Sequence, residues 1–255
     1  APSLAVLVAA QLVVGVAAGI ALPAIYTLAA VIAPPGRESE TIGVVLTGWT
    51  LSMVAGVSLS AVLADFVGWR AVYAAVAAVA LAAAVTVLSA RVREEPAANS
   101  APPSLLTALR VPGAASLLAA NAAFMASFYG VYAYLGDHFH HGLGLPLSAN
   151  GLAALCYGLG FGGAAFLDRL VDRVGAGGLL PPIFLAVAAV FALMAAANGS
   201  YAGMLAVIFV WGLANHFGLN VLIMRLTALD PTRRGAIMGL NSGVTYLALF
   251  AGTIG

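Results

Sequence analysis

Long stretches without charge constrain this chain more than any other feature. Seven windows of at least 20 residues contain no Asp, Glu, Lys or Arg: 1–36, 41–64, 71–90, 111–136, 142–167, 174–224 and 235–255. A helix needs about 20 apolar residues to cross a bilayer. Only helices and closed barrels can cross it, and these runs are continuous rather than alternating. With 63% hydrophobic and 7% charged residues, the sequence predicts an all-α integral membrane protein.

The longest uncharged window must hold more than one helix. As a single helix, residues 174–224 would measure roughly 75 Å. The sequence Asn198-Gly199-Ser200 supplies a turn that divides it. We therefore expect about eight transmembrane helices, at residues 4–32, 41–64, 70–89, 113–135, 148–167, 179–197, 201–225 and 235–255.

The arginines predict the orientation of these helices. Every basic residue is an arginine, and nine of the ten fall in alternate loops, whereas the remaining loops hold only Arg70. By the positive-inside rule, the loops with nine arginines are cytoplasmic and both chain ends lie outside. Because the chain begins and ends within apolar runs, we expect further spans beyond it.

One polar segment divides the chain into two bundles. Residues 90–112 are rich in proline, so we expect an extended, mobile cytoplasmic linker. Within it, residues 104–110 could form a short helix at the membrane surface. The expected organisation is thus the end of an N-terminal bundle at 1–89, with three spans, and a C-terminal bundle at 113–255, with five.

Two further patterns concern the loops. A Pro-x-Arg-x5-Gly pattern occurs twice, 196 residues apart: Pro35, Arg37 and Gly43, then Pro231, Arg233 and Gly239. This repeat suggests duplicated halves related by an axis along the membrane normal. In addition, four of the chain's few charges fall within the six positions 168–173. We interpret residues 168–175 as a tight polar turn between two apolar spans.

Several motifs resemble those of bacterial drug:proton antiporters in the major facilitator superfamily. They are Pro34-Pro35-Gly36-Arg37, Gly68-Trp69-Arg70 and Asp172-Arg173-Val174-Gly175. The resemblance covers the whole chain, as spans four to eleven of twelve. It implies a partial major-facilitator bundle that exports small organic compounds by proton antiport and alternating access. It further implies a multi-pass protein of the bacterial inner membrane, monomeric at full length and without a cofactor.

The resemblance also implies roles for individual residues. The loop motifs imply gating roles for Asp172, Arg173, Gly175, Arg37 and Arg233, and the span motifs imply helix packing at Gly15, Gly48 and Gly56. Asp168 stands where the family motif begins with glycine, and Gln11 stands where the family carries an arginine associated with proton coupling. By pseudo-symmetry, Asp172 should meet the positive end of the helix at 41–64, around residues 41–43, and hold the cytoplasmic side closed.

Polar side chains inside spans are costly in lipid and often mark a transport pathway. His216 is the only His, Asp, Glu, Lys or Arg near the middle of an expected span, and Asn220 shares its helix face. The pair could bind substrate or relay a proton. Equally, it could form a hydrogen bond between helices.

Aromatic and amide side chains provide the other candidates for substrate binding. Asn121, Phe128 and Tyr132 follow one stripe of the expected helix at 113–135, with Tyr129 beside them. Aromatic rings with a polar tip suit amphipathic organic compounds, although such a stripe can also serve packing. Trp49 and Asn241 are further candidates.

Other classes of function find less support in the sequence. A net charge of +1 without a basic stripe excludes the usual nucleic-acid binder. The single Cys156 excludes a disulfide framework and a cysteine metal site. Asp137-His138-Phe139-His140-His141 is more typical of a hydrated loop than of a zinc site. Two alternatives to a transporter stay open: a truncated or non-transporting membrane protein, and a polytopic membrane enzyme for which no catalytic motif is present.

Overall fold

A computed structural model describes residues 4–57, 66–89, 104–146 and 149–254, and all regular structure among them is helical. Seven helical segments are long and apolar enough to cross a membrane by length and composition. These findings confirm the predicted all-α membrane fold.

The helix bounds follow the uncharged windows. The elements are α1 Leu4–Ile32, α2 Glu38–Leu51, η1 Ser52–Val57, α4 Trp69–Ser89, α5 Leu105–Leu109, α6 Ala114–Asp137, η2 His138–Gly142, α7 Ala149–Ala164, η3 Ala165–Leu167, α8 Asp168–Val174, α9 Leu180–Ala197, α10 Tyr201–Ala228 and α11 Arg234–Ile254. The span predicted at 41–64 corresponds to α2 and η1, and its last part lies outside the described residues. The count of eight spans therefore stays a prediction.

The chain divides into two compact units. One consists of Ala1–Thr50 together with Pro103–Gly255, and the other of Leu51–Pro102. The predicted division at residues 90–112 stays a prediction, since residues 90–103 lie outside the described part. In the smaller unit, the Arg70 guanidinium lies 4.4 Å from the centre of the Trp69 ring at the start of α4.

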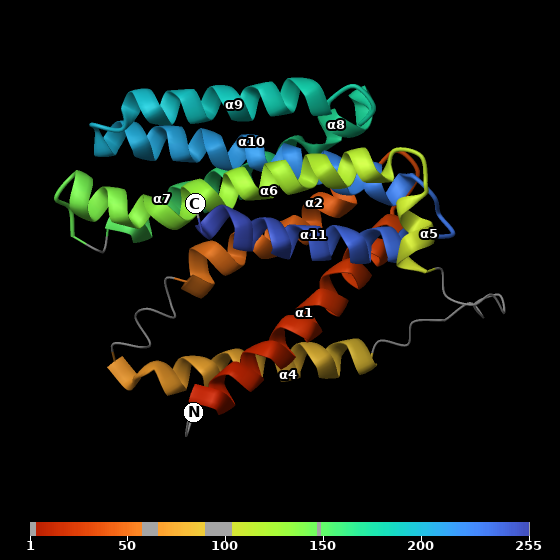
Figure 1. Cartoon of the computed structure of the whole chain (residues 1–255), viewed down its shortest axis with the longest axis horizontal. Helices are drawn as coiled ribbons and strands as arrows, with labels where there is room; N and C mark the ends of the chain where they lie inside the picture. Colours follow the sequence, from red (N-terminus) through yellow and green to blue (C-terminus); the bar gives the residue numbers. More distant parts are fainter. Residues whose placement is uncertain (1–3, 58–65, 90–103, 147–148, 255) are drawn as a thin grey trace. The chain divides into compact units, whose positions relative to one another are not determined.

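Within the larger unit, long helices run side by side. α7 packs along α10, α6 along α11, and α9 against α10, while α1 crosses α11 obliquely (Figure 1). Glycines permit the closest of these approaches. A Cβ atom on Gly212 would overlap the Tyr157 carbonyl oxygen, and one on Gly160 would overlap the Phe209 carbonyl oxygen. Small residues at such contacts let the backbones of membrane helices meet directly.

The glycines predicted to pack helices lie elsewhere. A Cβ atom on Gly15 or Gly48 would have no described atom within 4 Å, and one on Gly56 would meet only Ser52 Oγ of its own helical turn, at 3.7 Å. The close backbone approaches at Gly160 and Gly212 thus come from glycines that the span motifs did not indicate. A packing role for Gly15, Gly48 and Gly56 stays a prediction.

The polar cluster at 168–175 is helical, which corrects the interpretation as a tight turn. Asp168–Val174 forms α8, and the chain turns only at Gly175, where φ is 85°. Asp168 and Val171 are buried, while Arg169 and Arg173 are exposed. Because residues three apart share a helix face, the cluster places one acid inside the protein and its arginines outside.

A short surface helix is present where the sequence predicted it. Ser104 caps α5 by accepting a hydrogen bond from Thr107 N at 3.2 Å. Leu106 is 73% exposed, whereas Ala108 is fully buried against the bundle. α5 therefore presents leucine side chains outward just before α6.

Candidate functional site

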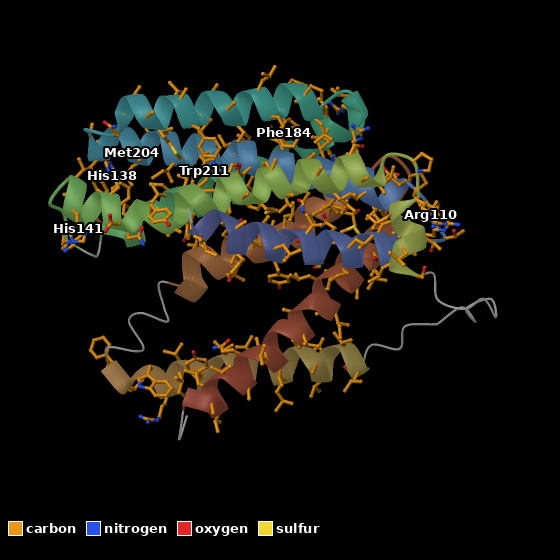
Figure 2. All side chains as sticks on the ribbon, in the orientation of Figure 1. Arg110, His138, His141, Phe184, Met204 and Trp211 are labelled. Atoms are coloured by element: carbon orange, nitrogen blue, oxygen red, sulfur yellow. The ribbon has the colours of Figure 1, made fainter. Side chains whose placement is uncertain are left out.

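The arginines of the larger unit gather at one end of the bundle, called here the arginine-rich end. Arg110 marks this end in Figure 2, and His138 and His141 mark the opposite end. Arg37, Arg169 and Arg173 line one hollow there together with Asp172. This is the end at which α1 passes into α2 and at which α8 lies.

Asp172 of α8 caps the first turn of α2. Its two carboxylate oxygens accept hydrogen bonds from Ser39 N at 2.7 Å and from Glu40 N at 3.2 Å. The first N–H groups of a helix have no partner within the helix, and the helix dipole favours an anion beside them. Arg37, which precedes α2, has no acceptor in its side chain. An acid distant in sequence therefore supplies the cap.

The predicted contact of Asp172 with the start of this helix is confirmed. It lies at residues 39 and 40 rather than at 41–43 because α2 begins at Glu38. Whether the contact acts as a gate stays a prediction at this stage, and the same holds for Arg173 and Gly175 beside it.

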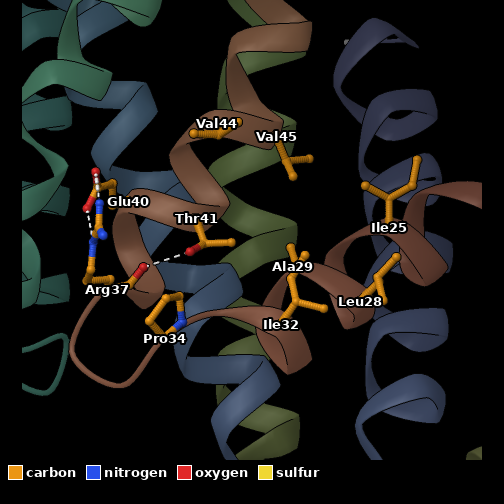
Figure 3. Close-up of a pocket in the computed structure, with 10 residues that line it drawn as sticks. All are labelled: Ile25, Leu28, Ala29, Ile32, Pro34, Arg37, Glu40, Thr41, Val44 and Val45. Carbon is orange, nitrogen blue, oxygen red and sulfur yellow. Dashed lines mark hydrogen bonds and ion pairs between the residues drawn. The ribbon is translucent and has the colours of Figure 1, made fainter. Parts of the chain in front are cut away.

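An ion-pair cluster surrounds this cap. Glu40 Oε2 lies 2.6 Å from Arg37 Nε and 3.3 Å from Arg169 Nε. Figure 3 shows the Arg37–Glu40 pair and the hydrogen bond from Thr41 Oγ1 to the Arg37 carbonyl, at the edge of an apolar hollow of about 400 Å³ between α1 and α2. The hydrogen bond from Arg37, followed by that from Arg169, lowers the pKa of Glu40 to about 2.

This pKa predicts how the cluster responds to acid. A carboxylate whose pKa is depressed on folding stabilises the fold above its unfolded pKa, and that contribution disappears as the pH falls towards the folded value. We expect the melting temperature of the wild type to exceed that of Glu40→Gln at pH 7. The difference should shrink as the pH falls from about 4.5 towards about 2. A difference that stays constant across this range in thermal melting would contradict the assignment.

Asp168 occupies the centre of a second, buried polar cluster. It is 1% exposed, and His216 Nε2 lies 2.9 and 3.1 Å from its two oxygens. The Asn220 side-chain amide donates to Asp168 Oδ1 at 3.0 Å and to the Ser39 carbonyl at 3.1 Å. The cluster therefore joins α8, α10 and α2 directly beneath the Asp172 cap.

Gly43 of α2 makes room for this cluster. A Cβ atom at position 43 would overlap the Asp168 carboxylate and lie 3.6 Å from Asn220 Nδ2. The Asp168 carboxylate is thus pressed against the bare backbone of α2. The sequence repeat had indicated Gly43, but without a reason for glycine there.

His216 and Asn220 were predicted to share a helix face, and both do point to Asp168. Each is fully buried, and His216 also meets Phe161 edge to face, with ring centres 5.0 Å apart. Among the described residues, His216 Nδ1 and Asn220 Oδ1 have no hydrogen-bond partner. In this conformation the helices around the pair enclose both side chains. Substrate binding by these residues stays a prediction.

The aromatic stripe of α6 contributes to a larger aromatic cluster. Phe128 is 5% exposed and stacks on Tyr132 with ring centres 5.4 Å apart. It also meets Tyr157 of α7 at 5.5 Å and Trp211 of α10 at 5.1 Å. Phe128 therefore packs in the core, while Tyr129 and Tyr132 are half-buried. Sequence reasoning missed Tyr157 and Trp211 because no spacing links residues on different helices.

The remaining candidates lie apart from one another. The Asn121 amide donates to Thr245 Oγ1 at 2.9 Å and so links α6 to α11. Trp49 of α2 faces Phe161 of α7, with ring centres 6.4 Å apart. Asn241 of α11 is 6% exposed.

Two loop features complete the comparison with the predicted sites. Arg233, the repeat partner of Arg37, lies 3.7 Å from Asp230 in the connection between α10 and α11. At the opposite end, each histidine of the 138–141 cluster contacts a different group: Asn198 O, Leu145 O and Asp137. No group of three metal-binding side chains occurs among the residues that the structure describes.

Comparison with known proteins agrees with this architecture. The chain is 24% identical over 249 residues to the MFS-type transporter YwfA of Bacillus subtilis, with 94% of the chain and 60% of that protein covered. It is 25% identical over 255 residues to the MFS-type transporter YbcL of the same organism, with 96% and 63% covered. The chain thus spans about three-fifths of the length of these relatives, which point to a transporter rather than an enzyme. A family model described as Major Facilitator Superfamily matches residues 1–253, and the chain belongs to this superfamily of membrane transporters.

Proposed function

We propose that the intact protein is a secondary active transporter that exports small organic compounds in exchange for protons across the bacterial inner membrane. The observation that carries this proposal is the Asp172 cap on α2. It joins the part of the chain before the linker to the part after it, at the end that the arginine distribution predicts to be cytoplasmic.

The chemistry of this cap suits a contact that must open and close. Both of its hydrogen bonds are only part-buried. When α8 and α2 separate, water can solvate the carboxylate and the N–H groups of Ser39 and Glu40. A hydrogen bond to a charged group contributes about 1.5–3 kcal/mol net, which is strong enough to favour closure and weak enough for reversal. Rocking of the two parts about this contact would give alternating access.

The tyrosines of α6 offer a surface for the substrate. Tyr129 and Tyr132 are half-buried, and Tyr129 lies near Tyr26 of α1 and Tyr246 of α11. Phenol groups on aromatic rings combine apolar contact with hydrogen bonding. This combination favours amphipathic organic compounds, in keeping with the apolar helices around them.

Transport by the intact protein in proteoliposomes tests this proposal. With an imposed pH gradient, ethidium flux can be followed by fluorescence, and internal pH by a trapped dye. We expect flux of ethidium, or of another amphipathic compound in a panel, to be coupled to opposite proton flux. Flux that does not depend on protons would support a transporter but contradict proton antiport. A protein that moves no compound of the panel would instead support the non-transporting alternative.

Asp172→Asn tests the role of the cap in the same assay. The amide keeps the size of the side chain but loses the negative charge, so at least one charge-assisted bond of about 1.5 kcal/mol is lost, equivalent to about tenfold in the closed-to-open ratio. We expect the initial rate of coupled transport to fall about tenfold. The matched control is Asp137→Asn, because Asp137 pairs with His141 at the opposite end. Equal rates for wild type and Asp172→Asn would rule out the gate.

A further inference from the structure

We propose that Asp168 and His216 together bind one proton, hold it while the arginine-rich end is closed, and release it to the cytoplasm when that end opens. The proposal deepens the proposed function and rests on it, since it assigns the coupling ion to a site. Asp168 stands at a position where the family motif has glycine. The motif itself therefore does not supply this site.

Burial limits the charge that this pair can carry. Asp168 is 1% exposed and His216 is fully buried. Moving a net charge from water into a protein interior costs several kcal/mol even after relaxation. If Asp168 is ionised and His216 neutral, the pair carries a net charge of −1. One additional proton, on either the imidazole or the carboxyl group, makes the pair neutral.

The geometry provides a place for this proton. Both Asp168 oxygens lie within 3.1 Å of His216 Nε2. A proton between them therefore forms a hydrogen bond whether it belongs to the imidazole or to the carboxyl group. His216 Nδ1 has no hydrogen-bond partner among the described residues. It can therefore gain a proton without breaking an existing hydrogen bond. The closed conformation thus favours the protonated, neutral pair.

The groups around the pair do not neutralise it in another way. On α8, Asp172 adds a second negative charge one turn away. Its carboxylate already accepts a hydrogen bond from Ser39 N at the start of α2. On α2, Glu40 is paired with Arg37 and Arg169.

The charged groups on α10 and on the other helices packed against it have partners elsewhere. Arg225 of α10 donates to the Gly177 carbonyl, and Arg234 of α11 donates to the Thr227 carbonyl. Asp137 of α6 pairs with His141 at the opposite end, and α1 carries no charge.

α7 and α9 contain no Asp, Glu, Lys or Arg. The titratable Tyr157 of α7 accepts a hydrogen bond from Asn215 instead. A proton is therefore the available means of neutralising Asp168.

Closure and proton binding are linked through α2. Asn220 joins Asp168 Oδ1 to the Ser39 carbonyl, and Gly43 covers the carboxylate. When α2 leaves, Asn220 loses the Ser39 carbonyl and Asp168 loses its cover. Water then reaches the carboxylate, the cost of its negative charge falls, and the proton can dissociate. The site opens to the same side as the Asp172 cap.

Distance measurements on the intact protein in nanodiscs test this site without any substrate. Spin labels would be attached at Pro35→Cys and Val174→Cys in a Cys156→Ala background. Both positions are exposed, one on each side of the contact between α2 and α8. The distance between the labels would report the fraction of molecules in the closed state. Release of one proton on opening requires the closed-to-open ratio to change about tenfold per pH unit within the titration window. Double electron–electron resonance would be recorded between about pH 3 and pH 9, a window that includes the ordinary pKa values of aspartate and histidine side chains.

Three variants distinguish this site from other causes of pH dependence. Asp168→Asn removes the carboxylate, and burial disfavours a cationic His216 without it, so the closed fraction should no longer rise as the pH falls. His216→Gln leaves one titratable carboxyl, so the tenfold slope should persist in a displaced window. Asp172→Asn should lower the closed fraction at every pH and keep the slope.

The outcomes also separate this proposal from the proposed function. A flat wild-type profile, or a wild-type slope in Asp168→Asn, overturns the proton site, and does so even if transport is intact. Failure of transport in proteoliposomes with a normal slope overturns the transporter instead. If Asp168→Asn does not fold, the wild-type slope and its persistence in His216→Gln still decide the question.

Discussion

Gly212→Ala is expected to lower the free energy of unfolding by about 2–3 kcal/mol, the usual cost of overpacking a tight contact. The new methyl group would overlap the Tyr157 carbonyl oxygen and lie 2.7 Å from Phe161 N. Both are backbone atoms of α7, so no side-chain rotation relieves the overlap. The helices must move apart, and the aromatic contacts between Tyr157, Phe128 and Trp211 loosen with them.

Unfolding by a denaturing detergent in mixed micelles would measure this change. Gly163→Ala is the matched control, because a Cβ atom at this position of α7 has no described atom within 4 Å. Alanine favours a helix over glycine by about 1 kcal/mol, so the control should keep or gain stability. Equal stability of Gly212→Ala and Gly163→Ala would show that α10 does not approach the backbone of α7 as closely as the structure indicates.

Gly43→Ala is expected to open the arginine-rich end with little effect on the fold of either part. Its methyl group would overlap the Asp168 carboxylate only while α2 lies against α8 and α10. A penalty of about 1–3 kcal/mol confined to the closed state lowers the closed-to-open ratio by about 5- to 150-fold. The same spin-label pair would report this as a loss of the short distance.

Gly48→Ala provides the control on the same helix, since a Cβ atom there meets no described atom within 4 Å. It should leave the distance distribution unchanged. If Gly43→Ala also leaves it unchanged, Asp168 does not abut α2 in the membrane. If both variants open the contact, helix propensity rather than steric overlap is responsible.

Sequence alone predicted the helices well because charge marks their ends. In lipid, a charged side chain is tolerated mainly near a helix end, so Arg37 closes the first uncharged window and Asp137 the fourth. The predicted span at 4–32 matches α1 Leu4–Ile32, and the span at 113–135 matches α6 Ala114–Asp137.

The buried site was harder to predict, because its members are joined only by the fold. Asp168 was grouped with its charged neighbours, although one residue of that cluster points inward and its partner His216 lies 48 positions away. The sequence did contain two unusual residues that could have been considered together. His216 is a histidine in the middle of an expected span, and Asp168 is an acid in place of a motif glycine. A buried charge requires a partner of opposite charge or a proton, and that rule connects them.

The 48 positions between Asp168 and His216 also bear on how the protein is made. At synthesis rates of roughly 5–20 residues per second, Asp168 precedes its partner by about 2–10 seconds. During that interval α7 and α8 carry an acid whose histidine has not yet left the ribosome. The carboxyl group must stay hydrated or protonated until α10 arrives. α8 can therefore pack in its final position only after α10 has been synthesised. The need to neutralise Asp168 thus sets the order in which these helices assemble.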